Sequence, residues 1–136
     1  MDKVAFNVTY TCDIPVMSED VVDTVVTAIE GGIGYWACLD NTGDEFKNAP
    51  EDECVSETVG RLLLEGKRIR FIDAEDNDEE WELDLGKLKN GFTLYAKDGY
   101  DTYGMVSSEG LDMSYMDAEA ADIIFQLALF GEVVYG

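Results

Sequence analysis

Residues 67–84 read KRIRFIDAEDNDEEWELD, and this stretch decides the fold class. Apolar and charged residues alternate on both sides of a polar turn, over 67–73 and again over 79–84. A period of two is typical of a half-buried strand, and a short turn rich in Asp and Asn between two such runs is typical of a hairpin. In the expected register Arg68 and Arg70 face Glu80 and Glu82, so that opposite charges pair across the strands.

Helical spacing of apolar residues predicts four helices around this hairpin, each starting after a capping residue or within a polar stretch. They are expected over 19–30 (capped by Ser18), 57–65 (capped by Ser56), 85–97 (capped by Asp84) and 115–130. Because Asn90-Gly91 lies inside the third helix, a shorter helix followed by a strand is the alternative there. Strands are expected over 3–11, with Tyr10 on its apolar face, and over 33–39 and 133–135. Pro15 is expected to end the first strand pattern, and loops are expected over 40–55 and 98–114.

These elements predict an α+β fold in a single compact domain, residues 1–136. Three to four helices would pack on an antiparallel or mixed sheet of about four strands. Tyr35 and Trp36 are expected on an interior strand, and Phe130 is expected to close the last helix onto the sheet. The glycines at 32 and 34 match part of a dinucleotide fingerprint, but they follow a helix and open a strand, which is the wrong context for one.

The charge balance excludes several classes of function. The chain has 30 Asp plus Glu, 9 Lys plus Arg and no His, for a formal charge of −21. Without His there is no His-dependent triad, His metal site or His proton shuttle. So negative a surface disfavours direct binding to nucleic acid and to anionic lipid. The apolar runs are too short to span a membrane and the N-terminus lacks the features of a signal peptide, so a cytoplasmic protein is expected.

The acidic residues gather in two stretches and on the last helix. Residues 40–57 hold seven and residues 73–84 hold eight, while no Lys or Arg follows Lys97. Carboxylates held along strands and helices repel nucleic acid and attract the basic grooves that bind it. On the last helix, Glu119, Asp122 and Gln126 share one face. The predicted protein-binding residues are Asp40, Asp44, Glu45, Glu51, Asp52, Glu53, Asp73, Glu75, Asp76, Asp78, Glu79, Glu80, Glu82, Glu119 and Asp122.

No residue pattern in the chain specifies catalysis or a cofactor. The acidic turn 73–78 lacks the Gly and the final Glu of an EF-hand loop, which leaves only weak cation binding open. Glu30 and Glu132 are the carboxylates to inspect for acid–base chemistry, although a buried structural role is expected of both. The cysteines have no zinc spacing and are expected to be reduced thiols, two of them in apolar strands: Cys12, Cys38 and Cys54.

Two motifs resemble small, acidic, uncharacterised proteins of bacteriophages and integrative elements. They are EGGIGYW at 30–36 and ADIIFQLALFGEVVYG at 121–136, and the elements between them follow the same order. The resemblance implies a viral or mobile-element origin, and with it the cytoplasm of a bacterial host, but it implies no reaction. By analogy with other small acidic proteins of such elements, it implies action against a host nucleic-acid-binding defence protein.

Three interpretations of function stay open. The first is a non-enzymatic acidic domain, without cofactor, that mimics DNA and binds a basic nucleic-acid-binding host protein. The second is a structural or accessory protein of a phage or element, with an apolar interface that salt does not weaken. The third is a small carboxylate-dependent hydrolase that holds a divalent metal on its acidic loops. The acidity also has a purely solubilising explanation.

Overall fold

The hairpin that the alternating sequence predicts forms two strands of a three-stranded antiparallel sheet. The computed structural model describes residues 2–9 and 13–136. Within them the elements are, in chain order, β1 (Val4–Thr9), β2 (Asp13–Met17), α1 (Ser18–Thr27), the π-helical turn η1 (Ala28–Gly32), β3 (Ala37–Leu39), α2 (Asp44–Lys47), α3 (Val55–Leu64), β4 (Ile69–Asp73), β5 (Glu80–Leu83), α4 (Leu85–Lys97), β6 (Val106–Ser107), β7 (Gly110–Leu111), the 3₁₀ turn η2 (Met113–Tyr115) and α5 (Ala118–Phe130). β4 pairs with β5 on one side and with β3 on the other. The hairpin is confirmed, but its register is shifted by two residues from the predicted one: Arg70 faces Glu82, Ile72 faces Glu80, and Arg68 lies before β4 and outside the paired residues.

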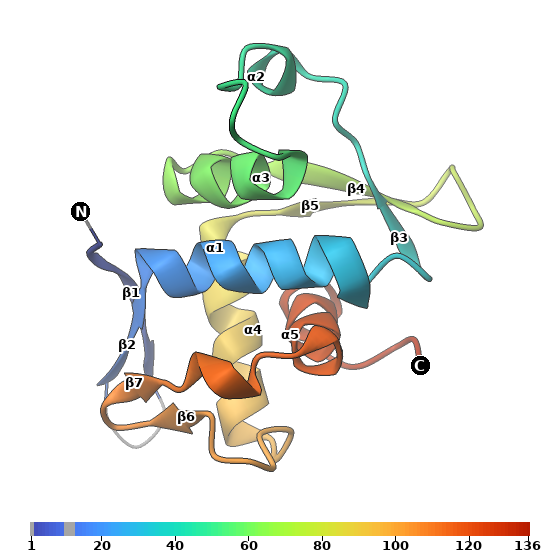
Figure 1. Cartoon of the computed structure of the whole chain (residues 1–136). Helices are drawn as coiled ribbons and strands as arrows, with labels where there is room; N and C mark the ends of the chain where they lie inside the picture. The colour runs from blue at the N-terminus through green and yellow to red at the C-terminus, as the bar shows by residue number, and fades with distance from the viewer. Residues whose placement is uncertain (1, 10–12) are drawn as a thin grey trace.

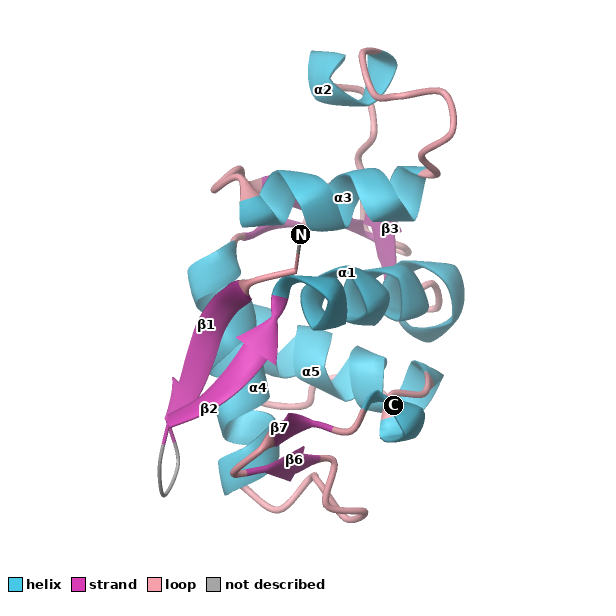
Figure 2. Ribbon diagram, turned by 60° about the vertical axis from the view of Figure 1, so that its left-hand side comes forward, coloured by secondary structure: helices cyan, strands magenta, loops and turns pink. Residues whose placement is uncertain are grey.

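The helices and the small sheets build one α+β domain, as predicted (Figures 1 and 2). α1 crosses the middle of the molecule with α3 beside it, and α4 packs against α5. β1 and β2 form a separate antiparallel hairpin, and β6 and β7 form a third small sheet next to β2. The described strands therefore form three antiparallel sheets, where the sequence predicts one sheet of about four strands. The predicted loops also contain short elements, namely α2 in the first and β6, β7 and the start of η2 in the second.

The β1–β2 hairpin is not predicted from the sequence, because its second strand contains Pro15. Pro15 predicts the end of a strand, yet it lies inside β2, opposite Asn7. In a two-stranded sheet both strands are edges, and an edge strand accommodates a residue that has no N–H to donate. The predicted strand over 3–11 is confirmed as β1, while residues 10 and 11, with the proposed apolar face of Tyr10, lie outside the described residues.

Capping residues start α4 and α5. The Asp84 carboxylate accepts a hydrogen bond from the Lys87 backbone N–H at 2.8 Å, as predicted, and Asp117 accepts one from the Ala120 N–H at the same distance. Gly131, with φ of 74°, ends α5 in the left-handed conformation that favours glycine. α5 thus begins at Ala118, slightly later than the predicted range of 115–130.

Ser18 and Ser56 do not cap their helices, contrary to the sequence prediction. α1 begins at Ser18 itself and α3 begins one residue before Ser56. Their hydroxyl groups have other acceptors: Ser18 donates to the Lys3 carbonyl at 2.8 Å, and Ser56 donates to the Glu30 carboxylate. Both hydroxyls therefore join neighbouring elements rather than the N–H groups of their own helices.

α4 and α5 approach each other closely at Gly91. A Cβ at this position would lie 2.5 Å from the carbonyl oxygen of Ile124 and 2.9 Å from the Cβ of Ala128. Gly91 is therefore accommodated inside an unbroken helix, because a residue with a side chain would push α5 away. The helix over 85–97 is confirmed, and the alternative with a strand in its second half is wrong.

The aromatic part of the core joins the last helix to the sheet. Tyr35 and Trp36 lie in the turn before β3, not on a strand, and only Trp36 is buried: 2% of it is exposed, against 54% of Tyr35. The Phe130 ring packs against Trp81 of β5 with centroids 5.1 Å apart. The prediction that Phe130 closes the last helix onto the sheet is confirmed, while the interior-strand prediction for residues 35 and 36 is wrong.

Candidate protein-binding surface

The strand β5 presents two carboxylates away from the core. Glu80 and Glu82 are exposed, whereas Leu83 is buried and Trp81 is half-buried. Successive side chains of a strand point to opposite sides of the sheet. The alternation that places Trp81 and Leu83 in the core therefore also places the two glutamates on the outside.

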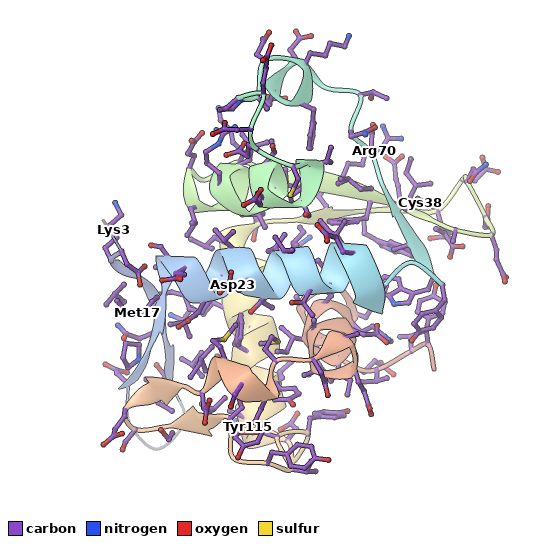
Figure 3. The ribbon with its side chains drawn as sticks, viewed as in Figure 1. Lys3, Met17, Asp23, Cys38, Arg70 and Tyr115 are labelled. Atoms are coloured by element: carbon purple, nitrogen blue, oxygen red, sulfur yellow. The ribbon has the colours of Figure 1, made fainter. Side chains whose placement is uncertain are left out.

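Arg70 joins the hairpin to the first acidic stretch. Its guanidinium forms ion pairs with Asp40, at 3.2 Å, and with Glu80. The Asp40 backbone N–H also donates to the Arg70 carbonyl at 3.0 Å, which extends the β3–β4 pairing by one residue. Hydrogen bonds from Thr42, with the Arg70 charge as a smaller cause, hold the pKa of Asp40 below its usual range. Two acidic stretches far apart in sequence thus meet at Arg70, which Figure 3 labels near the sheet.

The segment around α2 extends this acidic region beyond the sheet. α2 is the outermost helix at the top of Figure 1. Asp44 and Glu45 form its first turn, and Glu51 and Asp52 follow it in a turn before α3. All four side chains are exposed. These carboxylates are therefore accessible to a partner.

Glu53 has a different environment from its acidic neighbours. Its carboxylate accepts hydrogen bonds from the Arg61 Nε at 3.0 Å and from the Thr58 hydroxyl at 2.7 Å. These bonds, the one from Arg61 above all, hold the pKa of Glu53 below its usual range. Glu53 thus ties the acidic segment to α3 and contributes little free charge to the surface.

Two carboxylates shape the hairpin turn by accepting backbone hydrogen bonds: Asp76 accepts one from the Asp78 N–H at 3.0 Å, and Asp73 accepts two. One oxygen of Asp73 accepts hydrogen bonds from the backbone N–H groups of residues 75 and 76, at 2.8 and 2.9 Å. The other oxygen accepts one from the Tyr135 hydroxyl at 3.1 Å. These bonds, chiefly those from the backbone, hold the pKa of Asp73 below its usual range. The exposed carboxylates of the turn are Glu75, Asp76, Asp78 and Glu79.

We define the acidic hairpin face as Asp40 together with Glu75, Asp76, Asp78, Glu79, Glu80 and Glu82.

In the described part of the chain, no group of three or more Cys, Asp or Glu side chains is placed to hold a metal ion. Weak cation binding at the turn stays a prediction.

Asp122 lies in a hydrogen-bond network between the two sequence motifs, away from the free carboxylates. One of its oxygens accepts a hydrogen bond from the Tyr35 hydroxyl at 2.6 Å, and the other accepts from the Trp36 Nε1 at 2.8 Å and the Gln126 Nε2 at 2.9 Å. Burial and the bond to Asp122 raise the pKa of Tyr35 to about 12. Both oxygens of Asp122 are therefore committed internally, while Glu119, its predicted neighbour on the surface, is exposed at the start of α5.

Gln126 is the residue whose role sequence reasoning missed. It is fully buried, although the helix pattern places it on a polar face with Glu119 and Asp122. Its carbonyl oxygen accepts hydrogen bonds from the N–H groups of Val134 and Tyr135, both at 2.8 Å. Residues 133–135 do not form the predicted strand, because the N–H groups of residues 134 and 135 bond to the Gln126 side chain and not to a neighbouring strand.

The same network positions Tyr135 on Trp36. The two rings are stacked, with centroids 5.2 Å apart and an interplanar angle of 7°. Residues of the first motif, EGGIGYW, thus pack and hydrogen-bond with residues of the second, ADIIFQLALFGEVVYG. The structural role of the two motifs is therefore to hold the turn before β3 against α5 and the C-terminal segment.

Glu30 and Glu132 are both exposed. The prediction that both are buried is therefore wrong. Glu30 lies in η1 and accepts a hydrogen bond from the Ser56 hydroxyl at 2.5 Å. This contact joins the end of the first helix to the start of α3 without enclosing the carboxylate. Neither glutamate therefore has the buried environment that would tune it for acid–base chemistry.

Two cysteines are described, and both are exposed. Cys38 lies on β3, and Cys54 directly precedes α3, at the end of the predicted loop over 40–55. The third, Cys12, lies outside the described residues. Of the thiols expected in apolar strands, Cys38 does lie on a strand, but it is exposed.

Comparison of the chain with protein-family models, curated proteins and solved structures finds no match. Among the described helices, none combines the length and the apolar character needed to cross a membrane.

Proposed function

We propose that the protein binds a basic protein surface, of the kind that binds nucleic acid, through the acidic hairpin face and the α2 segment. The observation that carries this proposal is the meeting of two acidic stretches at Arg70. Of the thirteen predicted binding residues in those stretches, ten are exposed. A charged surface of this kind speeds the encounter with a positive groove and repels other acidic molecules.

The spacing of the carboxylates suits a competitor of nucleic acid. Glu80 and Glu82 are two residues apart on one strand, which separates them by about 7 Å along the strand. Each strand of duplex DNA carries one charge per 3.4 Å or so of helix axis. One row of strand carboxylates therefore has about half the charge density of one DNA strand, and the carboxylates of the turn and of the α2 segment add to it. If the chain has the mobile-element origin that its motifs imply, the partner is a protein of the bacterial host.

A comparison of two triple variants separates a specific surface from charge that only keeps the protein in solution. The test variant carries Glu79→Gln, Glu80→Gln and Glu82→Gln. The control carries Glu19→Gln, Asp23→Asn and Glu109→Gln, which removes the same charge from exposed residues elsewhere; Figure 3 shows Asp23 on α1, away from the hairpin. Loss of the exposed Arg70–Glu80 pair costs at most about 1 kcal/mol, so the fold should persist.

The immobilised proteins are incubated with a bacterial lysate, and with a purified basic DNA-binding protein and an equally basic protein that does not bind DNA. We expect the test variant to lose most of its binding to the DNA-binding protein and the control variant to keep it. Added duplex DNA should displace the partner, and binding should fall steeply with salt, because charges are screened beyond about 8 Å at physiological ionic strength. Equal losses in both variants would indicate generic charge. A partner that resists both salt and DNA would indicate an apolar accessory interface instead.

A further inference from the structure

A small pocket lined by tyrosines lies at the end of the molecule opposite α2. Figure 3 labels one of its residues, Tyr115, on the lower side of the view. The pocket has a volume of about 120 Å³ and lies between the end of α4, the loop that follows it, η2 and the start of α5. Its lining includes four of the seven tyrosines of the chain and two carboxylates: Tyr95, Tyr100, Tyr103, Tyr115, Asp117 and Glu119. We call it the tyrosine pocket.

Tyr103, one of two exposed rings of the pocket, lies in a loop that hydrogen bonds attach to the core. The Asp101 carboxylate accepts hydrogen bonds from the backbone N–H groups of residues 105 and 106, both at 2.8 Å, and Met105 is buried. The loop that carries Tyr103 is therefore anchored to the core. The Tyr103 and Tyr115 rings are parallel, with centroids 5.7 Å apart, yet 72% of Tyr103 and 41% of Tyr115 are exposed. The pocket thus displays ordered aromatic surface to the solvent.

The tyrosine pocket is negative, with no basic side chain in its lining. Glu119 is exposed, and Asp117 uses one oxygen to cap α5. No Lys or Arg occurs after Lys97. Burial, together with the charges of nearby carboxylates, raises the pKa of Tyr95 to about 12, so this ring stays neutral. The positive end of α5 offsets about half a charge, which is less than the two carboxylates supply.

We propose that the tyrosine pocket binds an organic cation, namely an alkylammonium or methylated ammonium group. The face of an aromatic ring attracts a cation, and aromatic pockets recognise quaternary ammonium groups in this way. The carboxylates strengthen the attraction and exclude anions. The volume corresponds to about four water molecules, far below the roughly 300 Å³ or more of sites for drug-sized ligands. A head group therefore fits the pocket, and a nucleotide does not.

Choline and its neutral isostere 3,3-dimethylbutan-1-ol test the need for positive charge. Each is titrated into the full chain at an ionic strength held constant with sodium chloride, and the tyrosine ring signals are followed by NMR. We expect choline to shift the Tyr103 and Tyr115 signals saturably and the neutral isostere to bind at least tenfold more weakly. Sodium in both titrations controls for cations that merely neutralise the surface.

Single substitutions test the geometry. Tyr103→Leu should weaken choline binding about two- to fivefold, as expected for one exposed cation–π contact, whereas Tyr103→Phe should retain it. Glu119→Gln should weaken binding, while Glu109→Gln, which removes the same charge outside the pocket, should not. Tyr103 is exposed enough that its replacement leaves the fold intact.

Two further ligands identify the source of the cation. A peptide with a trimethyl-lysine, and the same peptide with unmodified lysine, are compared with choline. Tighter binding of either peptide would assign the cation to the side chain of a partner protein, and tighter binding of choline would assign it to a free small molecule. The proposal is overturned if the neutral isostere binds as well as choline, if Tyr103→Leu has no effect, or if choline produces no saturable shift.

Discussion

Gly91→Ala and Gly86→Ala make the same chemical change in one helix, and we expect them to change the free energy of unfolding in opposite directions. Within a helix, Ala is more favourable than Gly by about 1 kcal/mol. A Cβ added at Gly86 would meet the Asp84 carboxylate at 3.4 Å, which is an ordinary contact. Gly86→Ala should therefore stabilise the protein by about 0.5–1 kcal/mol.

At Gly91 the same gain is outweighed by a steric clash. The new Cβ would lie 2.5 Å from the Ile124 carbonyl oxygen and 3.0 Å from the Ala128 backbone nitrogen. Both atoms belong to the backbone of α5, so the whole helix must shift to relieve the contact. Overpacking of a well-packed core costs about 1–3 kcal/mol. At the upper end of that range, expected when backbone must move, a net destabilisation of about 2 kcal/mol remains.

Urea unfolding followed by far-UV circular dichroism measures both effects. The midpoints should move to lower urea for Gly91→Ala and to higher urea for Gly86→Ala, with unchanged slopes. In thermal unfolding, 2 kcal/mol corresponds to about 6–8 °C for a chain of this size. If Gly91→Ala were as stable as the wild type or more so, the close approach of α4 and α5 at this position would be refuted.

Three other predictions concern the network that joins the two motifs. Gln126→Leu leaves the N–H groups of residues 134–135 without acceptors and should destabilise the fold by about 2–4 kcal/mol, with faster amide hydrogen exchange at those two residues. The folded pKa of Asp73 lies below its ordinary value of 3.8, so this carboxylate contributes stability that is complete above that value and is lost as the pH falls through the folded pKa. Asp73→Asn should therefore be less stable than the wild type at neutral pH, with the two urea midpoints converging in acid. In Trp81→Phe, the neutral quencher acrylamide should reach the remaining Trp36 only after denaturation, because 2% of that residue is exposed; strong quenching in the folded state would contradict its burial.

Some predictions from neighbours in sequence are confirmed, and others, such as the Ser18 and Ser56 caps, are wrong. The hairpin follows from the period-two pattern on both sides of its turn, and α4 follows from helical spacing together with Asp84 at its start. Gly91 is ambiguous in sequence, because the same residue ends helices and also permits close packing within them. Pro15 misleads for a related reason: whether a strand accommodates proline depends on being at an edge, which only the complete sheet defines.

Which carboxylates are exposed can be predicted from the sequence, but which of them accept hydrogen bonds from other parts of the chain cannot. The alternation around Trp81 places Glu80 outside without knowledge of the fold. Whether a carboxylate is free, however, depends on partners distant in sequence, as Tyr35 shows for Asp122. The sequence does carry one signal of the network: Gln126 interrupts the apolar run from Ile123 to Phe130, and a buried amide requires hydrogen-bond partners.

The two proposed sites attract the same kind of charge through forces that salt affects differently. Attraction to the acidic hairpin face is long-range Coulomb attraction between exposed groups, which is largely lost beyond a Debye length of about 8 Å. A cation in the tyrosine pocket is also held by direct contact with ring faces, and salt screens such close, partly buried contacts much less. A partner that uses the hairpin alone should therefore dissociate as salt rises, with no effect of choline. A partner that also inserts a cationic side chain into the pocket should show a salt-resistant remainder that choline removes and Tyr103→Leu abolishes. If choline displaced the partner equally from the wild type and from Tyr103→Leu, the competition would occur on the acidic surface, and the pocket would have no part in partner binding.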